Sequence, residues 1–150
     1  MSNCSIELWG NFYPIEQTTE LNLFRSGLTG LILLEISRLI NLTSINLSDN
    51  HLKSPIPSEI GNLVNLTSFS IYNNQISGAM PSEIGNLINL SIIQLRNNYI
   101  IGVITMSICD LNILWTGNNL FDINENQFCP QYPSCIEDSV DYRIQVIVIK

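Results

Sequence analysis

The sequence has few charged residues of either sign and very few basic ones. Its 150 residues include 6 Lys and Arg against 13 Asp and Glu, a formal net charge of -7, and a pI of about 4.4. Proteins that bind nucleic acid or anionic membranes present clustered Lys and Arg. Here the basic residues are scattered along the chain, so we expect no nucleic-acid partner.

Long apolar runs are also missing. The run Leu31 to Leu34 is interrupted by Glu35, whereas a transmembrane helix needs about 20 mostly apolar residues. The sequence therefore predicts no insertion into a membrane. No secretory signal is visible at Met1, and we interpret Met1 as the start of a fragment that has lost its export signal.

A 24-residue period dominates what is present, because apolar residues return in register over three successive units. Agreement in so many columns is far beyond chance for a period of this length. The eight columns are Leu42/Leu66/Leu90, Ile45/Phe69/Ile93, Leu47/Ile71/Leu95, Asn50/Asn74/Asn98, Leu52/Ile76/Ile100, Ile56/Met80/Ile104, Ile60/Ile84/Ile108 and Leu63/Leu87/Leu111.

Each unit combines a strand pattern with a second half that disfavours a regular α-helix. Alternation at Ile45 and Leu47 predicts a short strand with one buried face, and stacking of the units joins these strands into one parallel sheet. Pro57 and Gly61 predict 3-10 or irregular turns in the second half. A single unit buries too little apolar surface to fold alone, so neighbouring units must stabilise one another.

The pattern L-x-x-L-x-L-x-x-N-x-L resembles the leucine-rich repeat, and the segments Ile56 to Leu63 and Met80 to Leu87 resemble its plant-type subclass. The resemblance implies an α/β repeat solenoid, a right-handed superhelix with a parallel sheet on its concave face and 3-10 or irregular turns on its convex face. We expect an N-terminal cap at 1–17, about five repeats at 18–128, the last incomplete, a C-terminal cap at 129–142, and an atypical tail at 143–150. About four extra residues near 112–117 should make the convex side bulge.

The recurring asparagines have a structural task in this arrangement. Their amides can satisfy backbone groups that the turn after each strand would otherwise leave buried and unpaired. This Asn ladder comprises Asn50, Asn74, Asn98 and Asn126.

Four cysteines allow three pairings, and the sequence does not select among them. We favour Cys129 with Cys135, the pair closest in sequence, while Cys109, which stands in the column of Gly61 one coil earlier, is an alternative partner for Cys135. Cys4 is expected to be free or paired outside this chain. The C-x5-C spacing does not match usual zinc-ligand spacing, so we expect no metal.

The ends of the chain carry two further expectations. The segment from Phe128 to Ile136 resembles the C-terminal cap of secreted bacterial leucine-rich repeat proteins with the same 24-residue unit. The tail from Arg143 to Lys150 fits no repeat column, and two interpretations stay open: a frameshift that has replaced a polar, cysteine-ending tail, or a short edge strand or unstructured end.

Nothing in the sequence predicts an enzyme or a cofactor. His51 is the only histidine, and its position is filled by Gln75 and Tyr99 in the following units. No nucleophile motif, phosphate-binding Gly loop or cluster of metal ligands accompanies it.

The exposed side of the strands is the candidate binding surface, since strand alternation points the residues that flank each buried pair outward. Phe24, Ser48, Tyr72 and Arg96 form one column, and exposed aromatic and Arg side chains are frequent in binding hot spots. The predicted ligand-binding residues are Phe24, Arg25, Asn46, Asp49, Tyr72, Asn73, Gln94, Arg96, Asn97 and Asp122.

We therefore predict non-catalytic recognition of a protein, peptide or glycan by the concave face. The alternative is a structural or adhesive spacer module of a larger secreted or cell-surface protein. The resemblance and the four cysteines together imply an extracellular or cell-surface location, while cytoplasmic residence stays open.

Overall fold

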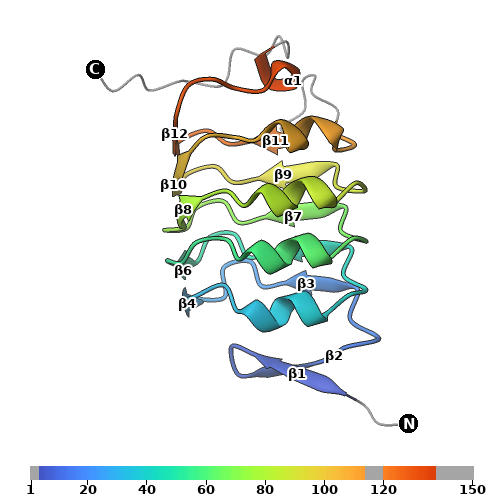
Figure 1. Cartoon of the computed structure of the whole chain (residues 1–150). Coiled ribbons are helices and arrows are strands. Elements are labelled where there is room, and N and C mark those ends of the chain that lie inside the picture. The colour runs from blue at the N-terminus through green and yellow to red at the C-terminus, as the bar shows by residue number, and fades with distance from the viewer. Residues whose placement is uncertain (1–3, 114–119, 138–150) are drawn as a thin grey trace.

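The computed structural model describes residues 4–113 and 120–137, and it shows a stack of coils with one continuous core. The coils follow one another from the N-terminal to the C-terminal end of the stack (Figure 1). Their apolar residues form a single buried cluster that extends from Ile6 to Ile136. The predicted α/β repeat solenoid is thus confirmed.

The main sheet is built from one short strand per coil, and all its strands are parallel. Its order is β11-β9-β7-β5-β3. Ile45, Phe69 and Ile93 are paired in register across three neighbouring strands and are fully buried, as the repeat predicts. The strands are β3 (Glu20–Asn22), β5 (Ser44–Asn46), β7 (Ser68–Ser70), β9 (Ile92–Gln94) and β11 (Phe121–Asp122).

A second set of parallel strands, which the prediction of one sheet missed, lies along one edge of the stack (Figure 1). Its sequence signal is a second alternation, in which buried Leu52 and Ile100 lie between exposed neighbours. The strands are β4 (Thr29–Gly30) paired with β6 (His51–Leu52), and β8 (Ser77–Ala79), β10 (Tyr99–Gly102) and β12 (Gln127–Phe128) in a sheet with β10 in the centre.

The side of the stack opposite the main sheet carries one 3-10 helix in each of four coils, which confirms the expected 3-10 turns (Figure 1). Pro57 and Pro81 directly precede two of these helices, at a position where a missing N–H costs nothing. Neighbouring helices pack so closely that a Cβ atom on Gly61 would lie 2.7 Å from the carbonyl oxygen of Glu83. The helices are η1 (Leu34–Arg38), η2 (Ser58–Asn62), η3 (Ser82–Asn86) and η4 (Met106–Asp110).

Each end of the core is covered by a different element. At the N-terminal end, strands β1 (Ser5–Leu8) and β2 (Asn11–Pro14) form an antiparallel hairpin that buries Ile6 and Leu8. At the C-terminal end, the short helix α1 (Ser134–Glu137) buries Ile136. The expected tail at 143–150, the end of the expected cap at 138–142 and most of the expected insertion lie outside the described residues.

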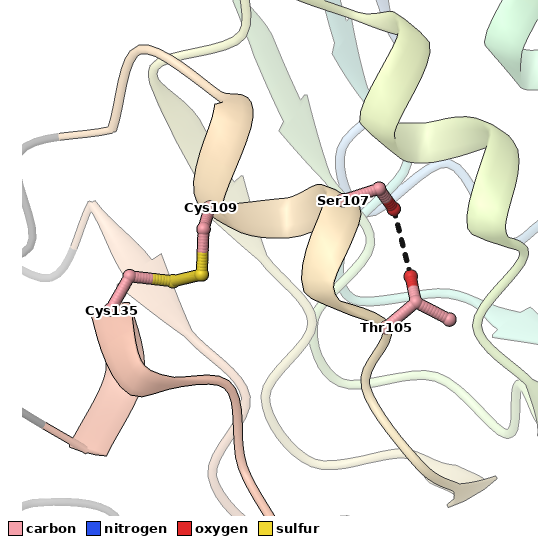
Figure 2. Close-up of a disulfide and its surroundings, with 4 residues drawn as sticks. All are labelled: Thr105, Ser107, Cys109 and Cys135. Carbon is pink, nitrogen blue, oxygen red and sulfur yellow. Dashed lines mark hydrogen bonds between the residues drawn. A yellow bond between two sulfur atoms is a disulfide. The ribbon is translucent and has the colours of Figure 1, made fainter.

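The structure corrects the favoured disulfide, because Cys135 is bonded to Cys109 and not to Cys129 (Figure 2). The column that Cys109 shares with Gly61 and Gly85 points toward the next coil, where a Cβ atom on either glycine would collide with a neighbour. In the last coil the next layer is α1, so the Cys109 side chain meets Cys135, with Cα atoms 5.6 Å apart. Cys129 follows β12 and is an exposed thiol.

Candidate functional site

The Asn ladder separates the main sheet from the second set of strands and holds both in place. Asn50 accepts hydrogen bonds from the backbone N–H groups of Ser26 and Leu28 at 3.0 and 2.9 Å. Its Nδ2 donates to the carbonyl oxygens of Leu23 and Leu47, both at 2.9 Å. The amides of Asn74, Asn98 and Asn126 make the corresponding contacts one coil further along, with Asn126 less buried than the others.

The residue before each ladder Asn, and Arg25 before Ser26 at the equivalent position of the first coil, has a left-handed backbone, which turns its side chain onto the main-sheet side. Arg25, Asp49, Asn73, Asn97 and Glu125 have φ between 51 and 56°. Asn and Asp tolerate this conformation better than most residues because their short polar side chains bond locally. Arg and Glu are less usual in this conformation. Arg25 forms an ion pair with Asp49, and Glu125 forms one with Arg96.

Four of these residues form a hydrogen-bonded row across the first four coils. Arg25 Nε donates to Asp49 Oδ2 at 3.0 Å, Asn73 donates to the other carboxylate oxygen of Asp49, and Asn97 donates to Asn73 Oδ1 at 3.0 Å. Asp49 therefore accepts hydrogen bonds from both neighbouring coils. The row holds four predicted ligand-binding residues in fixed positions.

An aromatic pair lies beside this row. The rings of Phe24 and Tyr72 have centroids 6.4 Å apart and are tilted by 54°, and the Arg25 guanidinium lies over the Phe24 ring, 5.0 Å from its centroid. Such a contact is favourable between a cation and the negative face of a ring. Ser48, expected to be exposed in the same column, is fully buried, and its hydroxyl has no hydrogen-bond partner among the described residues.

The C-terminal part of the face is charged. Arg96 forms an ion pair with Glu125, and this contact raises the pKa of Arg96, so its charge is kept at all relevant pH values. Both side chains are about half exposed, and pairs of this kind contribute little to stability. Breaking this ion pair would therefore cost little free energy.

The remaining predicted residues lie at the strand ends of the same face. Asn46 accepts a hydrogen bond from the Ser48 N–H, Gln94 accepts one from the Ser70 hydroxyl at 2.8 Å, and Asp122 accepts two from Asn124. The structure thus brings all ten predicted residues onto one side of the main sheet. It adds Glu125, the partner of Arg96, which the predicted set did not include.

The described part of the chain shows no candidate catalytic or metal site. His51 is exposed in β6, next to Thr29 in register and away from the main-sheet side chains. Within residues 4–113 and 120–137 no group of three or more His, Cys, Asp or Glu could hold a metal ion. The same residues contain no helix that is long and apolar enough to cross a bilayer.

Comparison with known proteins agrees with the repeat. A family model described as Leucine Rich Repeat matches residues 41–63 and 65–87. A search of curated protein sequences finds no match.

Solved structures with the same fold include plant receptor ectodomains. The Arabidopsis receptor kinase HAESA, in complex with the peptide hormone IDA and the co-receptor SERK1, is 26% identical with a TM-score of 0.73, covering 85% of this chain and 22% of its own. The plant peptide hormone receptor RGFR1, in complex with RGF2, is 28% identical with a TM-score of 0.71, covering 81% and 19%. The BIR2 ectodomain from Arabidopsis thaliana is 25% identical with a TM-score of 0.69, covering 76% and 58%.

The chain spans less than two thirds of each of these three proteins. The 24-residue consensus, the coil geometry and these similarities together identify plant-type leucine-rich repeats in this chain.

Proposed function

We propose that the main-sheet side of this solenoid is a recognition surface that binds a peptide or an extended segment of a protein without catalysis. The observation that carries the proposal is the hydrogen-bonded row from Arg25 to Asn97 beside the Phe24–Tyr72 pair. A surface whose side chains are already ordered loses little conformational entropy on binding. Two of the similar plant ectodomains are described in complex with peptides, which supports the same class of ligand here.

The chemistry of the surface favours a polar peptide with apolar anchors. Asn73, Asn97 and Gln94 offer amide donors and acceptors that suit a peptide backbone. Arg96 offers a cation for a carboxylate, and the aromatic pair offers apolar contact. The disulfide between Cys109 and Cys135 supports placing the protein in an oxidising compartment, outside the cell or at its surface.

Selection from a random peptide library displayed on phage, with the full chain as bait, tests this function. Selected peptides are measured by titration calorimetry against the chain and against Tyr72→Ala and Arg96→Ala. We expect each substitution to weaken binding by about tenfold or more, which corresponds to about 1.4 kcal/mol. Glu59→Ala and Lys53→Ala, which change charges away from the main sheet, are the matched controls and should leave affinity unchanged.

Two results would overturn the proposal. If the selected peptides bind all four variants as tightly as the parent chain, the main-sheet side is not the binding surface. If no peptide is enriched over an unrelated bait, the module is a spacer rather than a receptor for peptides. Circular dichroism of each variant verifies that the exposed substitutions leave the fold intact.

A further inference from the structure

Ser48 lies between Phe24 and Tyr72 in one column of side chains, and the two aromatic rings are closer together than the backbone positions that carry them. Phe24, Ser48 and Tyr72 hold the same position in three successive coils, linked by the hydrogen bonds from Arg25 N to Ser48 O and from Asp49 N to Tyr72 O. Neighbouring strands lie about 4.8 Å apart, so two coils separate Phe24 from Tyr72 by about 10 Å at the backbone. Their ring centroids are only 6.4 Å apart, so the rings lean toward each other across Ser48.

The closed rings leave a polar group without a partner. Ser48 is 0% exposed, and its Oγ forms no hydrogen bond among the described residues. A buried hydroxyl that has lost water and gained no partner is unfavourable. Such groups are rare in folded proteins, and each calls for an explanation. A ligand atom that reaches this hydroxyl is one explanation.

Rotating the rings apart would produce a space that fits one further ring. A flat ring between two others needs about 3.5 to 4.0 Å on each side, or about 7 to 8 Å between the outer rings. The backbone spacing of about 10 Å permits this separation without moving any coil. Phe24 is 38% exposed and lies on the surface, so side-chain rotation is sufficient to open the column.

The Ser48 hydroxyl at the bottom of the opened space determines which ligand side chain fits best. A serine hydroxyl donates one hydrogen bond and accepts others, so it pairs with a phenolic hydroxyl and leaves a plain phenyl ring or an aliphatic side chain without a polar contact. The walls are two aromatic rings, which favour an aromatic guest over an aliphatic one of equal volume.

We propose that Phe24, Ser48 and Tyr72 form a closed slot that opens to receive a tyrosyl side chain of an extended peptide, with its hydroxyl on Ser48 Oγ. The proposal rests on the proposed function of the same surface and specifies one residue of the ligand.

A second unpartnered atom indicates how such a peptide is placed. Asn124 Oδ1 is buried in the same column without a hydrogen-bond partner among the described residues, and three coils separate it from Ser48. That distance is about 14 Å, or about four residues of extended chain. A peptide that crosses the strands along this column therefore places a hydrogen-bond donor about four residues from its tyrosine, with Arg96 between the two anchors.

The test compares two small probes that differ by one hydroxyl. N-acetyl-tyrosinamide and N-acetyl-phenylalaninamide are titrated into the full chain, and binding is followed by the NMR shifts of the Tyr72 ring and the Ser48 methylene. We expect the tyrosine probe to bind about tenfold more tightly. Ser48→Ala should abolish this preference and leave the affinity for the phenylalanine probe unchanged, since it removes only the hydroxyl at the floor. Tyr72→Leu should weaken both probes.

Misfolding does not confuse the result, because Ser48→Ala removes an unpartnered buried group and should be at least as stable as the parent chain. If the preference for tyrosine persists in Ser48→Ala, or if neither probe shifts the Tyr72 signals, the slot is wrong. If the probe test fails but the library peptides still bind Arg96→Ala more weakly than the parent chain, the slot is wrong and the proposed function is retained. Conversely, probe binding without any selected peptide supports the slot and overturns the proposed function.

Discussion

Replacing Asn74 with alanine is the sharpest test of how the coils are held together. Asn74 is buried in the middle of the ladder, where its Oδ1 accepts from the Leu52 N–H at 3.1 Å and its Nδ2 donates to the carbonyl oxygens of Leu47 and Ile71 at 3.0 Å. These four backbone and side-chain groups belong to two neighbouring coils. The substitution therefore acts on the contact between coils rather than within one.

The size of the loss in stability depends on how many buried groups lose their last hydrogen-bond partner. The Leu47 and Ile71 carbonyl oxygens keep a hydrogen bond from Asn50 and Asn98. The Leu52 N–H has no second partner among the described residues, and Leu52 is fully buried. One orphaned buried donor costs about 1 to 3 kcal/mol, so we expect Asn74→Ala to lower the free energy of unfolding by that amount.

Urea unfolding followed by far-ultraviolet circular dichroism measures this loss as a shift of the midpoint at unchanged slope. Gln75→Ala, which changes the next side chain without removing a hydrogen bond described here, is the control and should cost less than about 0.5 kcal/mol. Asn126→Ala removes the half-buried end of the ladder, where water can replace the amide, and should cost less than Asn74→Ala. Equal stability of the Asn74 and Gln75 variants would refute the reasoning.

Three further outcomes follow from the same structure. Joint replacement of Cys109 and Cys135 by serine should lower the free energy of unfolding by about 3 to 4 kcal/mol, since the bridge spans 26 residues; a thermal melt unaffected by this change or by reductant would contradict the observed pairing. Gly61→Ala should lower the free energy of unfolding, measured in urea, by about 1 to 3 kcal/mol, because its Cβ atom would lie 2.7 Å from a backbone oxygen in the next coil. The control Asn62→Ala changes an exposed neighbour and should be neutral. Equal effects of the two substitutions would show that the coils can separate freely. Arg96→Gln should change stability by less than about 1 kcal/mol in the same assay, because its ion pair is half exposed, and a larger loss would show that this residue serves the fold rather than a ligand.

The repeat made most of the fold predictable, because a solenoid is governed by contacts between equivalent positions. Once Ile45, Phe69 and Ile93 are recognised as one column, stacking of the coils requires them to pair in register, as the structure shows. The second set of strands was missed because each of its strands buries at most one residue, such as Leu52, whereas each main-sheet unit shows an alternating buried pair such as Ile45 and Leu47. The side of the strands that faces outward was also predictable, since alternation alone decides it.

Sequence alone determined the period, the buried columns, the 3-10 turns and the set of side chains on the main-sheet side, because all of these follow from local patterning repeated every 24 residues. Only the tertiary structure decided which cysteine reaches Cys135 and how the surface side chains combine. Both depend on how closely the coils approach, which brings Cys109 against the cap and lets Phe24 and Tyr72 meet over Ser48. Distances between side chains from different coils are set by packing, and no single coil encodes them.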